Sequence, residues 1–544
     1  MLHAADHGQS SEEVPGFRMT VPADLPRTIP HVALAAAQKF GAQEGIVDDV
    51  VRLTFADVKD RMLAAAAAFV AAGLKKGDTV ALWAPNSAAW IVAALAIQSA
   101  GGTMVPLNTR YKGGEAQFIL NKSRARFLVT VSDFLGMSYP KMLEGLDLPH
   151  LERMLVLDRT DGDQTSWTAF LAGADDASRK TVDERLAAMT GDEVSDIMFT
   201  SGTTGSPKGV MTTHWQNVRV YYAWGESVGL RFADRYLMFY PYFHCSGYKS
   251  GWLACFIKGA TTLPEAVLDV PRLMKRAAAE KVTVLPGPPT LFQTLLSAPP
   301  SERGEKLSLR LAVTGAASVP PAMIRRMIDE LGIQRVMVGY GLTETCGTVT
   351  MTLENDPPEL VAQSCGVAIP GTEIRCVDEN NKPVPIGQAG EIMARGYNNM
   401  LGYFEDPKAT AETIEPDGWL HTGDIGVIDE RGYLRITDRK KDMFIVGGFN
   451  CYPAEIEQIM LSNPSYAQVG VIGVADERLG EVGKAFVVPK PGVTLTEKEV
   501  IAWCREAMAN FKVPRYVQIM DALPLTPSGK VQRFKLKELD QAKA

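Results

Sequence analysis

The sequence lacks the cysteine and histidine patterns of a metal site. Its seven cysteines form no CxxC pair, and its seven histidines form no HExxH motif. Those spacings are typical of structural zinc sites and of zinc hydrolases. An odd, scattered set of cysteines also favours a reducing compartment. We therefore expect no protein-bound transition metal and a cytoplasmic location.

The sequence also lacks a long apolar run and an excess of basic residues. Residues 90–107 are the most apolar stretch, but Gln98, Ser99 and two glycines interrupt it. This stretch predicts a buried helix that runs into a strand, and no integral membrane segment. The first residues carry acids and have no apolar core, unlike a signal peptide. A net charge of −7 argues against a general nucleic-acid binder.

What is present is an alternation of helical and strand-like stretches over the first 350 residues. Residues 61–73 form an alanine-rich run ended by glycine, which is typical of a helix, and residues 78–83 follow as a strand. The alternation returns between residues 281 and 339. It predicts an α/β core of layered, mainly parallel sheets.

The pattern changes after about residue 365. Short β-like runs alternate there with turn clusters, which predicts a β-barrel-like subdomain. A small α+β unit begins near residue 452, and the charged run at residues 438–442 precedes it. We predict an N-terminal domain at 1–437, a hinge at 438–441 and a C-terminal domain at 442–544.

Residues 199–210, FTSGTTGSPKGV, are rich in glycine and hydroxyl groups and include one lysine. Glycines allow a backbone to turn tightly and bring its N–H groups to a polyphosphate. The strand-like residues 196–199 place this loop at a strand end, where α/β folds bind ligands. Its spacing is neither that of a Walker A loop nor GxGxxG. The segment therefore predicts a phosphate loop of another kind.

This loop resembles the phosphate loop of the adenylate-forming superfamily, which includes acyl-CoA synthetases, peptide-synthetase adenylation domains and firefly-type luciferases. The resemblance covers roughly residues 30 to 535 and implies a large N-terminal domain with a small, mobile C-terminal lid. It implies that ATP and a carboxylic acid give an acyl-adenylate and pyrophosphate, and that a thiol then displaces AMP. Seven further motifs follow in the family's order: PYFHCSG at 241–247, GAA at 315–317, YGLTE at 340–344, GWLHTGD at 418–424, YLRITDRKKD at 433–442, GGFNCYPAEIE at 447–457 and PLTPSGK at 524–530.

The resemblance implies a nucleotide site with Mg²⁺ as cofactor. Glu344 would hold the metal beside Thr203, which orients the phosphates. Tyr340 would pack on adenine, and Asp424 would accept hydrogen bonds from both ribose hydroxyls. The residues implied to bind ATP or AMP are Thr200, Ser201, Gly202, Thr203, Thr204, Gly205, Lys208, Gly315, Ala316, Ala317, Gly339, Tyr340, Gly341, Thr343, Asp424 and Arg439.

The resemblance also implies a moving catalytic group. Lys530 would bridge the carboxylate and phosphate oxygens during adenylation, a role suited to a point charge on a flexible stem. The lid would then rotate about Lys441, because a hinge residue absorbs the change in φ and ψ. Three residues would then face the channel of the CoA thiol, where glycines leave room: Gly447, Gly448 and Phe449.

The implied acyl pocket comprises Phe243, His244, Gly247 and Tyr248, with His244 among the catalytic residues. Amino-acid-activating relatives usually carry an aspartate at the position of His244, so an α-amino acid is a poor candidate. Long-chain ligases often carry tryptophan at the position of Tyr248, and this chain departs from them. The motifs look closest to those of bacterial ligases for aliphatic or steroid-derived propanoates. We expect a fatty or other hydrophobic acid, with a steroid-ring-derived propanoate as the narrower hypothesis.

Several alternatives stay open at this level. Free CoA is the expected thiol, since only fourteen residues follow Lys530 and no carrier domain is among them. A stand-alone enzyme that loads a carrier protein is the main alternative, and a luciferase-like oxygenase would need a luciferin. A non-catalytic nucleotide sensor is disfavoured by the retained lysine and glutamate. The oligomeric state is open, with a homodimer among the candidates.

Overall fold

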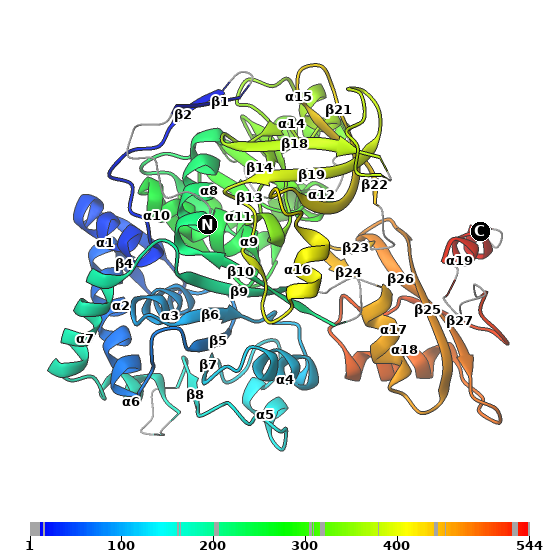
Figure 1. Cartoon of the computed structure of the whole chain (residues 1–544), viewed down its shortest axis with the longest axis horizontal. Helices are drawn as coiled ribbons and strands as arrows, with labels where there is room; N and C mark the ends of the chain where they lie inside the picture. Colours follow the sequence, from blue (N-terminus) through cyan, green and yellow to red (C-terminus); the bar gives the residue numbers. More distant parts are fainter. Residues whose placement is uncertain are drawn as a thin grey trace.

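Two large sheets with helices packed between them form the N-terminal part of the chain (Figure 1). The computed structural model describes residues 11–14, 17–159, 163, 165–200, 206–303, 307, 309–315, 321–378, 380–439, 444–451, 453–524, 531 and 533–541. The first sheet has seven strands, in the order β20 (Gly402–Tyr403), β10 (Lys208–Thr213), β9 (Val194–Thr200), β6 (Thr103–Pro106), β5 (Thr79–Trp83), β7 (Phe127–Thr130) and β8 (Arg153–Val156).

The second sheet has nine strands and contributes most of the site described below. Its central strands are parallel, as the alternating pattern predicts. The order is β17 (Val367–Ala368), β16 (Thr350–Met351), β15 (Val336–Tyr340), β14 (Leu311–Gly315), β13 (Val284–Pro286), β11 (Arg235–Met238), β12 (Thr261–Pro264), β3 (Glu44–Val47) and β4 (Arg52–Thr54).

Helix α3 (Ala88–Ser99) lies between these layers and is buried at eleven of its twelve positions. A helix that is apolar on all sides belongs inside a protein, because no face of it can meet water favourably. The chain then enters β6 after two glycines, so the prediction for residues 90–107 is confirmed. Among the described helices, none is long and apolar enough to cross a membrane.

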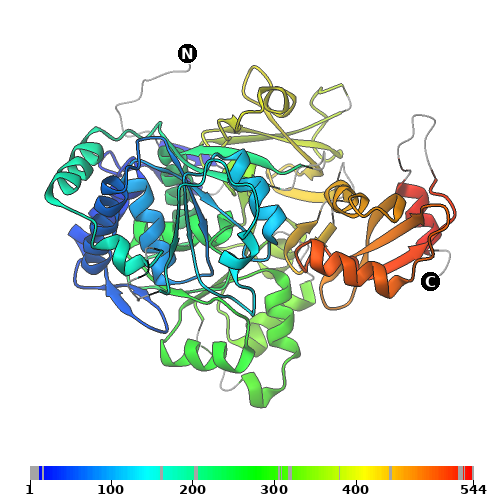
Figure 2. The same cartoon turned by 90° about the horizontal axis from the view of Figure 1, so that it is seen from below.

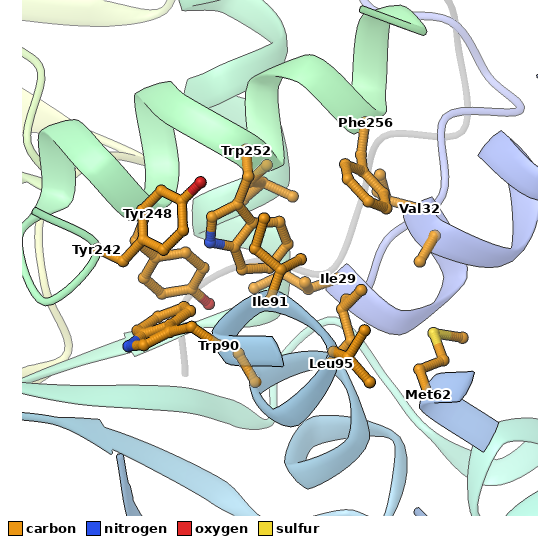
Figure 3. Close-up of a cluster of buried hydrophobic side chains, with 14 of the residues drawn as sticks. Ile29, Val32, Met62, Trp90, Ile91, Leu95, Tyr242, Tyr248, Trp252 and Phe256 are labelled. Atoms are coloured by element: carbon orange, nitrogen blue, oxygen red, sulfur yellow. The ribbon is translucent and has the colours of Figure 1, made fainter. Parts of the chain in front are cut away.

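The core around α3 joins segments that are distant in sequence (Figure 3). Trp90 and Leu95 of α3 meet Met62 of α2 (Phe55–Ala71) and Ile29 of α1 (Ile29–Phe40). From the other side comes Trp252 of the π-helix η1 (Tyr248–Leu253), which runs into α10 (Ala254–Lys258). This packing fixes η1, whose preceding turn forms a wall of the site.

A third, antiparallel sheet follows in the region where turn clusters predict one. Its strands are β18 (Thr372–Val377), β19 (Gly390–Gly396), β21 (Leu420–Ile428) and β22 (Leu434–Arg439). The pairing partners then change. Strand β22 pairs with β21, whereas β23 (Phe444–Val446) pairs with β24 (Phe449–Cys451) and β26 (Gly480–Pro489). We keep 1–437, 438–441 and 442–544 as the proposed N-terminal domain, hinge and C-terminal domain.

The C-terminal unit is a small sheet with helices on both faces, and both views show it beside the larger part (Figures 1 and 2). One face packs on α17 (Pro453–Leu461) and α18 (Glu497–Ala507). The other face packs on α19 (Arg533–Gln541) through Leu536. The remaining strands are β25 (Tyr466–Asp476) and β27 (Tyr516–Ile519). We call this unit the lid.

Candidate active site

A cavity of about 1280 Å³ opens at the carboxyl ends of β11, β13, β14 and β15. Parallel strands place their carboxyl ends at one edge of a sheet, where α/β proteins bind ligands. Both parts of the chain line this cavity. The predicted site residues in its lining are Thr200, Phe243, His244, Gly315, Gly339, Tyr340, Gly341, Thr343, Glu344, Asp424, Gly448 and Phe449.

The nucleotide side is built on closely spaced backbones. A Cβ on Gly315 would lie 2.5 Å from the Gly339 carbonyl oxygen, so β14 and β15 leave no room for a side chain there. The Tyr340 hydroxyl donates a hydrogen bond to Asp424 Oδ2 at 2.7 Å. Arg439 stands opposite Asp424 in the β21–β22 register, and only its backbone is described. The residues predicted to hold adenine and ribose thus lie together at one end of the cavity.

Glu344 lies where the two ends of the phosphate loop meet. Thr200 ends β9, Lys208 begins β10, and the two residues are paired across these strands. Glu344 Oε1 accepts a hydrogen bond from the Tyr403 hydroxyl at 2.9 Å. Burial raises the pKa of the Glu344 carboxyl, and Tyr403, Lys208 and Thr200 partly counter this. A buried carboxylate beside the phosphate loop is therefore a suitable ligand for a cation.

The donor set fits magnesium better than a transition metal. Within the described part of the chain, no cluster of three or more His, Cys, Asp or Glu side chains could hold a metal ion. Mg²⁺ is commonly bound by one or two carboxylates together with substrate phosphates, and needs no such cluster. Glu344 supplies one such carboxylate, next to Lys208 and Thr200 at the ends of the phosphate loop.

Several predicted site residues lie outside the described residues. In the phosphate loop and the adenine-side loop these are Ser201, Gly202, Thr203, Thr204, Gly205, Ala316 and Ala317. In the hinge and the catalytic loop they are Lys441 and Lys530.

His244 faces the cavity from the acyl side. Its Nδ1 accepts a hydrogen bond from the Ser246 backbone N–H at 3.2 Å, which caps the short helix α9 (Cys245–Gly247). The ring is exposed to the cavity, although protein atoms surround it closely. This burial, together with the charge of Lys249, lowers the pKa of the His244 imidazole. The ring is therefore neutral near pH 7 and can meet an anionic substrate without an added positive charge.

Gly247 and Tyr248, which we predicted in the acyl pocket, are absent from the cavity lining. Tyr248 is fully buried, its hydroxyl accepts a hydrogen bond from Gln98 Nε2 at 2.8 Å, and its ring stacks on Trp252 (Figure 3). A Cβ on Gly247 would lie 2.1 Å from the Pro241 carbonyl oxygen, so the glycine allows this close turn. Both residues stand behind the wall and support it.

Residues other than Gly247 and Tyr248 line the cavity on the acyl side. The cavity walls there include Trp224, Tyr236, Tyr240 and Ser250. The Tyr236 hydroxyl donates to the Ser250 carbonyl oxygen at 2.9 Å. No hydrogen bond joins the Tyr240 hydroxyl to another of the described residues. The sequence offered one signal for Tyr240, which is its position directly before the PYFHCSG motif.

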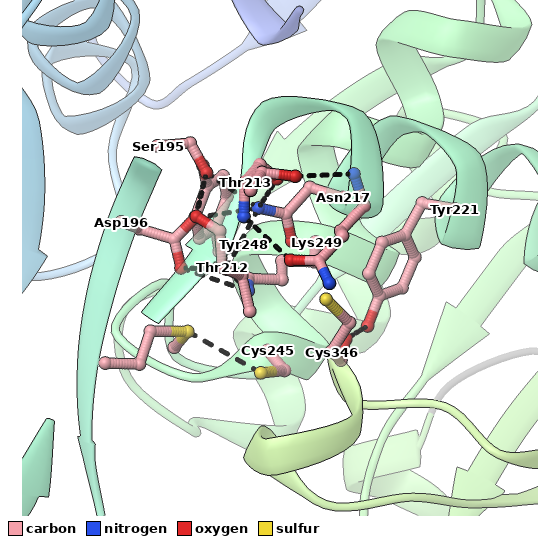
Figure 4. A network of polar contacts seen from close by, with 12 residues as sticks. Ser195, Asp196, Thr212, Thr213, Asn217, Tyr221, Cys245, Tyr248, Lys249 and Cys346 are labelled. Carbon is pink, nitrogen blue, oxygen red and sulfur yellow. Dashed lines mark hydrogen bonds and ion pairs between the residues drawn. The ribbon is translucent and has the colours of Figure 1, made fainter. Parts of the chain in front are cut away.

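A buried ion pair joins the acyl wall to the phosphate-loop strand (Figure 4). Lys249 Nζ lies 3.0 Å from Asp196 Oδ1, and neither side chain is exposed. Lys249 also donates to the Thr212 hydroxyl at 2.9 Å, and Asn217 Nδ2 donates to Asp196 Oδ2 at 2.9 Å. Burial alone would lower the pKa of Lys249, but Asp196, together with the nearby thiols of Cys245 and Cys346, outweighs burial and raises it. This pair holds η1 against β9, which leads into Thr200.

The lid contributes the turn between β23 and β24 to the cavity lining. Gly448 and Phe449 line the cavity, while Gly447 precedes them in the turn between β23 and β24. Leu523 and Val531 pack near Gly470 on the opposite face of the lid sheet. These two residues flank the PLTPSGK motif, so the predicted thiol-channel loop faces the site and the flanks of the lysine loop face away.

Known protein families match both parts of this architecture. The AMP-binding enzyme pattern matches residues 34–404, and the AMP-binding enzyme C-terminal domain matches residues 455–530. The chain belongs to the AMP-binding enzyme family. Together with the CoA ligases that it resembles, described next, this match makes it an AMP-forming acid–thiol ligase of the acyl-CoA synthetase type.

The relatives that this chain resembles include proteins named as CoA ligases. A Rhodococcus jostii protein is 48% identical over 95% of this chain and 99% of its own, and is named as the CoA ligase of a 7a-methyl-1,5-dioxo-octahydro-1H-inden-4-yl propanoate. A Mycobacterium tuberculosis protein of the same name is 44% identical over 96% of this chain and 99% of its own. The solved o-succinylbenzoate CoA synthetase of Bacillus subtilis is 28% identical, with a TM-score of 0.78 over 94% of this chain and 98% of that one.

Proposed function

We propose that this protein uses ATP and Mg²⁺ to activate a ring-bearing, keto-substituted propanoate and transfers the acyl group to CoA. The observation that carries this proposal is the acyl end of the cavity. Aromatic side chains wall it, and one of them, Tyr240, has a hydroxyl with no partner among the described residues. The two relatives above are named as CoA ligases of a dioxo-octahydroindenyl propanoate. That acid combines a ring system, ketone groups and a propanoate chain.

In the first half-reaction the substrate carboxylate attacks the α-phosphorus of ATP and pyrophosphate leaves. Mg²⁺, when bound, would neutralise phosphate charge. Asp424, with Tyr340 donating to it, would hold the ribose, and Glu344 would hold the metal. Neutral His244 would line the path of the carboxylate without repelling it or pairing with it. We keep Lys530 as the proposed bridge between the two anions.

In the second half-reaction the CoA thiolate attacks the acyl carbonyl carbon and AMP leaves with the cleaved C–O electron pair. The lid orientation described above supports a role in this step, because Gly448 and Phe449 face the cavity. A Cβ on Gly448 would lie 3.1 Å from Pro288, so a side chain would narrow the approach of the thiol arm. Lys441 remains the proposed pivot between the two orientations.

The hydroxyl of Tyr240 favours a substrate that carries a hydrogen-bond acceptor. A buried hydroxyl that loses water and gains no acceptor costs free energy, on the order of 1–3 kcal/mol. An unsubstituted alkyl chain beside Tyr240 would leave its hydroxyl unpaired, whereas a ring ketone would accept its hydrogen bond. Sites of this type discriminate by rejecting the analogue that lacks the polar group.

A matched panel of acids tests the proposal. CoA-dependent AMP formation would be measured for a keto-substituted bicyclic propanoate, the same ring system without ketones, an alkyl acid of similar size and an α-amino acid. We expect the keto acid to give the highest kcat/KM and the amino acid no turnover. A higher kcat/KM for the hydrocarbon acids would overturn the substrate class. Turnover with a carrier protein but not with CoA would overturn the acceptor.

Three narrower expectations remain predictions. The cytoplasmic location rests on the scattered cysteines. The oligomeric state stays open, with a homodimer among the candidates. Dependence on Mg²⁺ is testable by removing and restoring divalent ions during turnover.

A further inference from the structure

The lid is joined to the N-terminal domain by a buried lysine. Lys512 lies between α18 and β27, and its side chain is 2% exposed. Its Nζ is 2.7 Å from Glu115 Oε1 and 2.7 Å from Glu455 Oε1. The ring of Tyr111 completes the enclosure, with its centroid 4.7 Å from the ammonium. A buried ammonium thus bonds two carboxylates at once.

The two carboxylates belong to different parts of the molecule. Glu455 is in the first turn of α17 and moves with the lid. Glu115 is in the first turn of α4 (Gly113–Lys122), in the N-terminal domain. Its second oxygen accepts a hydrogen bond from the Lys112 backbone N–H at 2.9 Å, which holds the carboxylate in place. Of the two ion pairs of Lys512, the one with Glu115 therefore depends on the orientation of the lid, and the one with Glu455 does not.

The charges around Lys512 allow its bond to Glu115 to form in one lid orientation and to break in another. Burial alone would lower the pKa of Lys512, but Glu455 and Glu115 outweigh it and raise the pKa. Burial raises the pKa of Glu455, and its Oε2 has no hydrogen-bond partner within the described part of the chain. If the lid rotates, Lys512 keeps Glu455 and Glu115 becomes free to meet water. Neither orientation then leaves the lysine without a counter-ion, which would be costly.

We propose that the Lys512–Glu115 ion pair is a latch that selects the lid orientation of the thioester-forming step; this inference rests on the two-step function proposed above. The latch adjoins the channel it would hold. Lys512, Tyr111, Phe449 and Phe511 all line the cavity, and the rings of Phe449 and Phe511 stack with centroids 4.6 Å apart. Closing the latch places this aromatic wall against the site, and opening it withdraws the wall.

Two substitutions next to Lys512 distinguish an effect on lid orientation from a general effect on packing. Glu115→Gln removes the inter-domain charge, whereas Glu455→Gln removes an equally close carboxylate within the lid. For Glu115→Gln we expect the rate of thioester formation from supplied acyl-adenylate to fall by about tenfold, with the adenylation rate within about twofold of wild type. For Glu455→Gln we expect the ratio of the two rates to stay within about twofold. An unchanged ratio in Glu115→Gln, or an equal fall in both variants, would overturn the latch.

A distance measurement tests the latch without any activity. Spin labels would be attached through cysteines introduced at the exposed Lys141, in the N-terminal domain, and Lys498, in the lid. Glu115→Gln is expected to move the distance distribution away from that of the present orientation, and Glu455→Gln to leave it in place. The same distribution in wild type and Glu115→Gln would overturn the latch. If no acid supports turnover but the distribution shifts as expected, the proposed function fails and the latch stands.

Discussion

The two walls of the active-site cavity are held in different ways. On the N-terminal side, polar side chains are fixed by buried bonds, such as Tyr340 to Asp424 at 2.7 Å and Lys249 to Asp196 at 3.0 Å. On the lid side, the wall comes from a glycine turn and an aromatic pair, and a buried ion pair that joins it to the other domain is Lys512 to Glu115. The described nucleotide and acyl residues are therefore fixed within the N-terminal part, whereas we propose that the thiol channel forms in one lid orientation.

The largest expected effect comes from removing the one lid group assigned to the first step. Lys530→Ala is expected to lower the rate of acyl-adenylate formation by about 1000-fold or more, because the developing charge loses its bridge. Thioester formation from supplied adenylate is expected to persist. Single-turnover assays of each half-reaction measure both rates. An equal loss in the two steps would contradict the division of labour, and Lys498→Ala, an exposed lid lysine, is the control.

The next effect concerns the rigidity of the N-terminal wall. Lys249→Met leaves Asp196 buried without its counter-ion and is expected to lower the free energy of unfolding by about 3–5 kcal/mol. Lys258→Met breaks a partly exposed pair with Glu226 and is expected to cost about 1 kcal/mol or less. Urea denaturation followed by tryptophan fluorescence compares the two variants. A similar small cost for both would mean that the buried pair does not stabilise this wall.

A third effect addresses the metal. Glu344→Gln keeps the shape of the side chain but removes its charge, so the adenylation rate is expected to fall by about 100-fold. The Mg²⁺ concentration for half-maximal rate is expected to rise at the same time. A magnesium titration of the first half-reaction measures both quantities. A lower rate with an unchanged magnesium requirement would contradict the role of this carboxylate as a metal ligand.

The smallest effect sharpens the acyl end of the cavity. Tyr240→Phe removes a hydroxyl that has no partner among the described residues, so kcat/KM for a keto-substituted ring propanoate is expected to fall by about tenfold. The value for the matching acid without ketones is expected to stay the same or to rise. An equal fall for both acids would show that Tyr240 contributes shape and not a hydrogen bond.

Much of the fold and of the nucleotide side could be predicted from the sequence because its signals are local. The apolar stretch at 90–107 fixes a buried helix and strand within 18 residues, and the phosphate loop is flanked by its own strands, β9 and β10. Glu344 and Asp424 were predicted from short motifs, and both line the cavity. In each case the residues that decide the structure are neighbours in the chain.

The acyl wall and the latch could not be predicted, for physical reasons that differ. Tyr248 follows His244 by four residues, a spacing that favours one face of an α-helix. His244 instead caps the short helix α9 from an extended backbone, and Tyr248 begins the π-helix η1, so the two side chains do not share one helix face. Lys512 meets Glu115 across 397 residues, and no pattern around either residue indicates the contact.

Exchange of labelled pyrophosphate into ATP, measured without CoA, tests the central claim most directly. The claim is that the N-terminal wall, Mg²⁺ and Lys530 of the lid together form an acyl-adenylate before any thiol is bound. We expect a keto-substituted ring propanoate to support exchange that requires Mg²⁺ and is lost in Lys530→Ala. Absence of exchange with every acid of a broad panel, in the presence of Mg²⁺, would contradict the account.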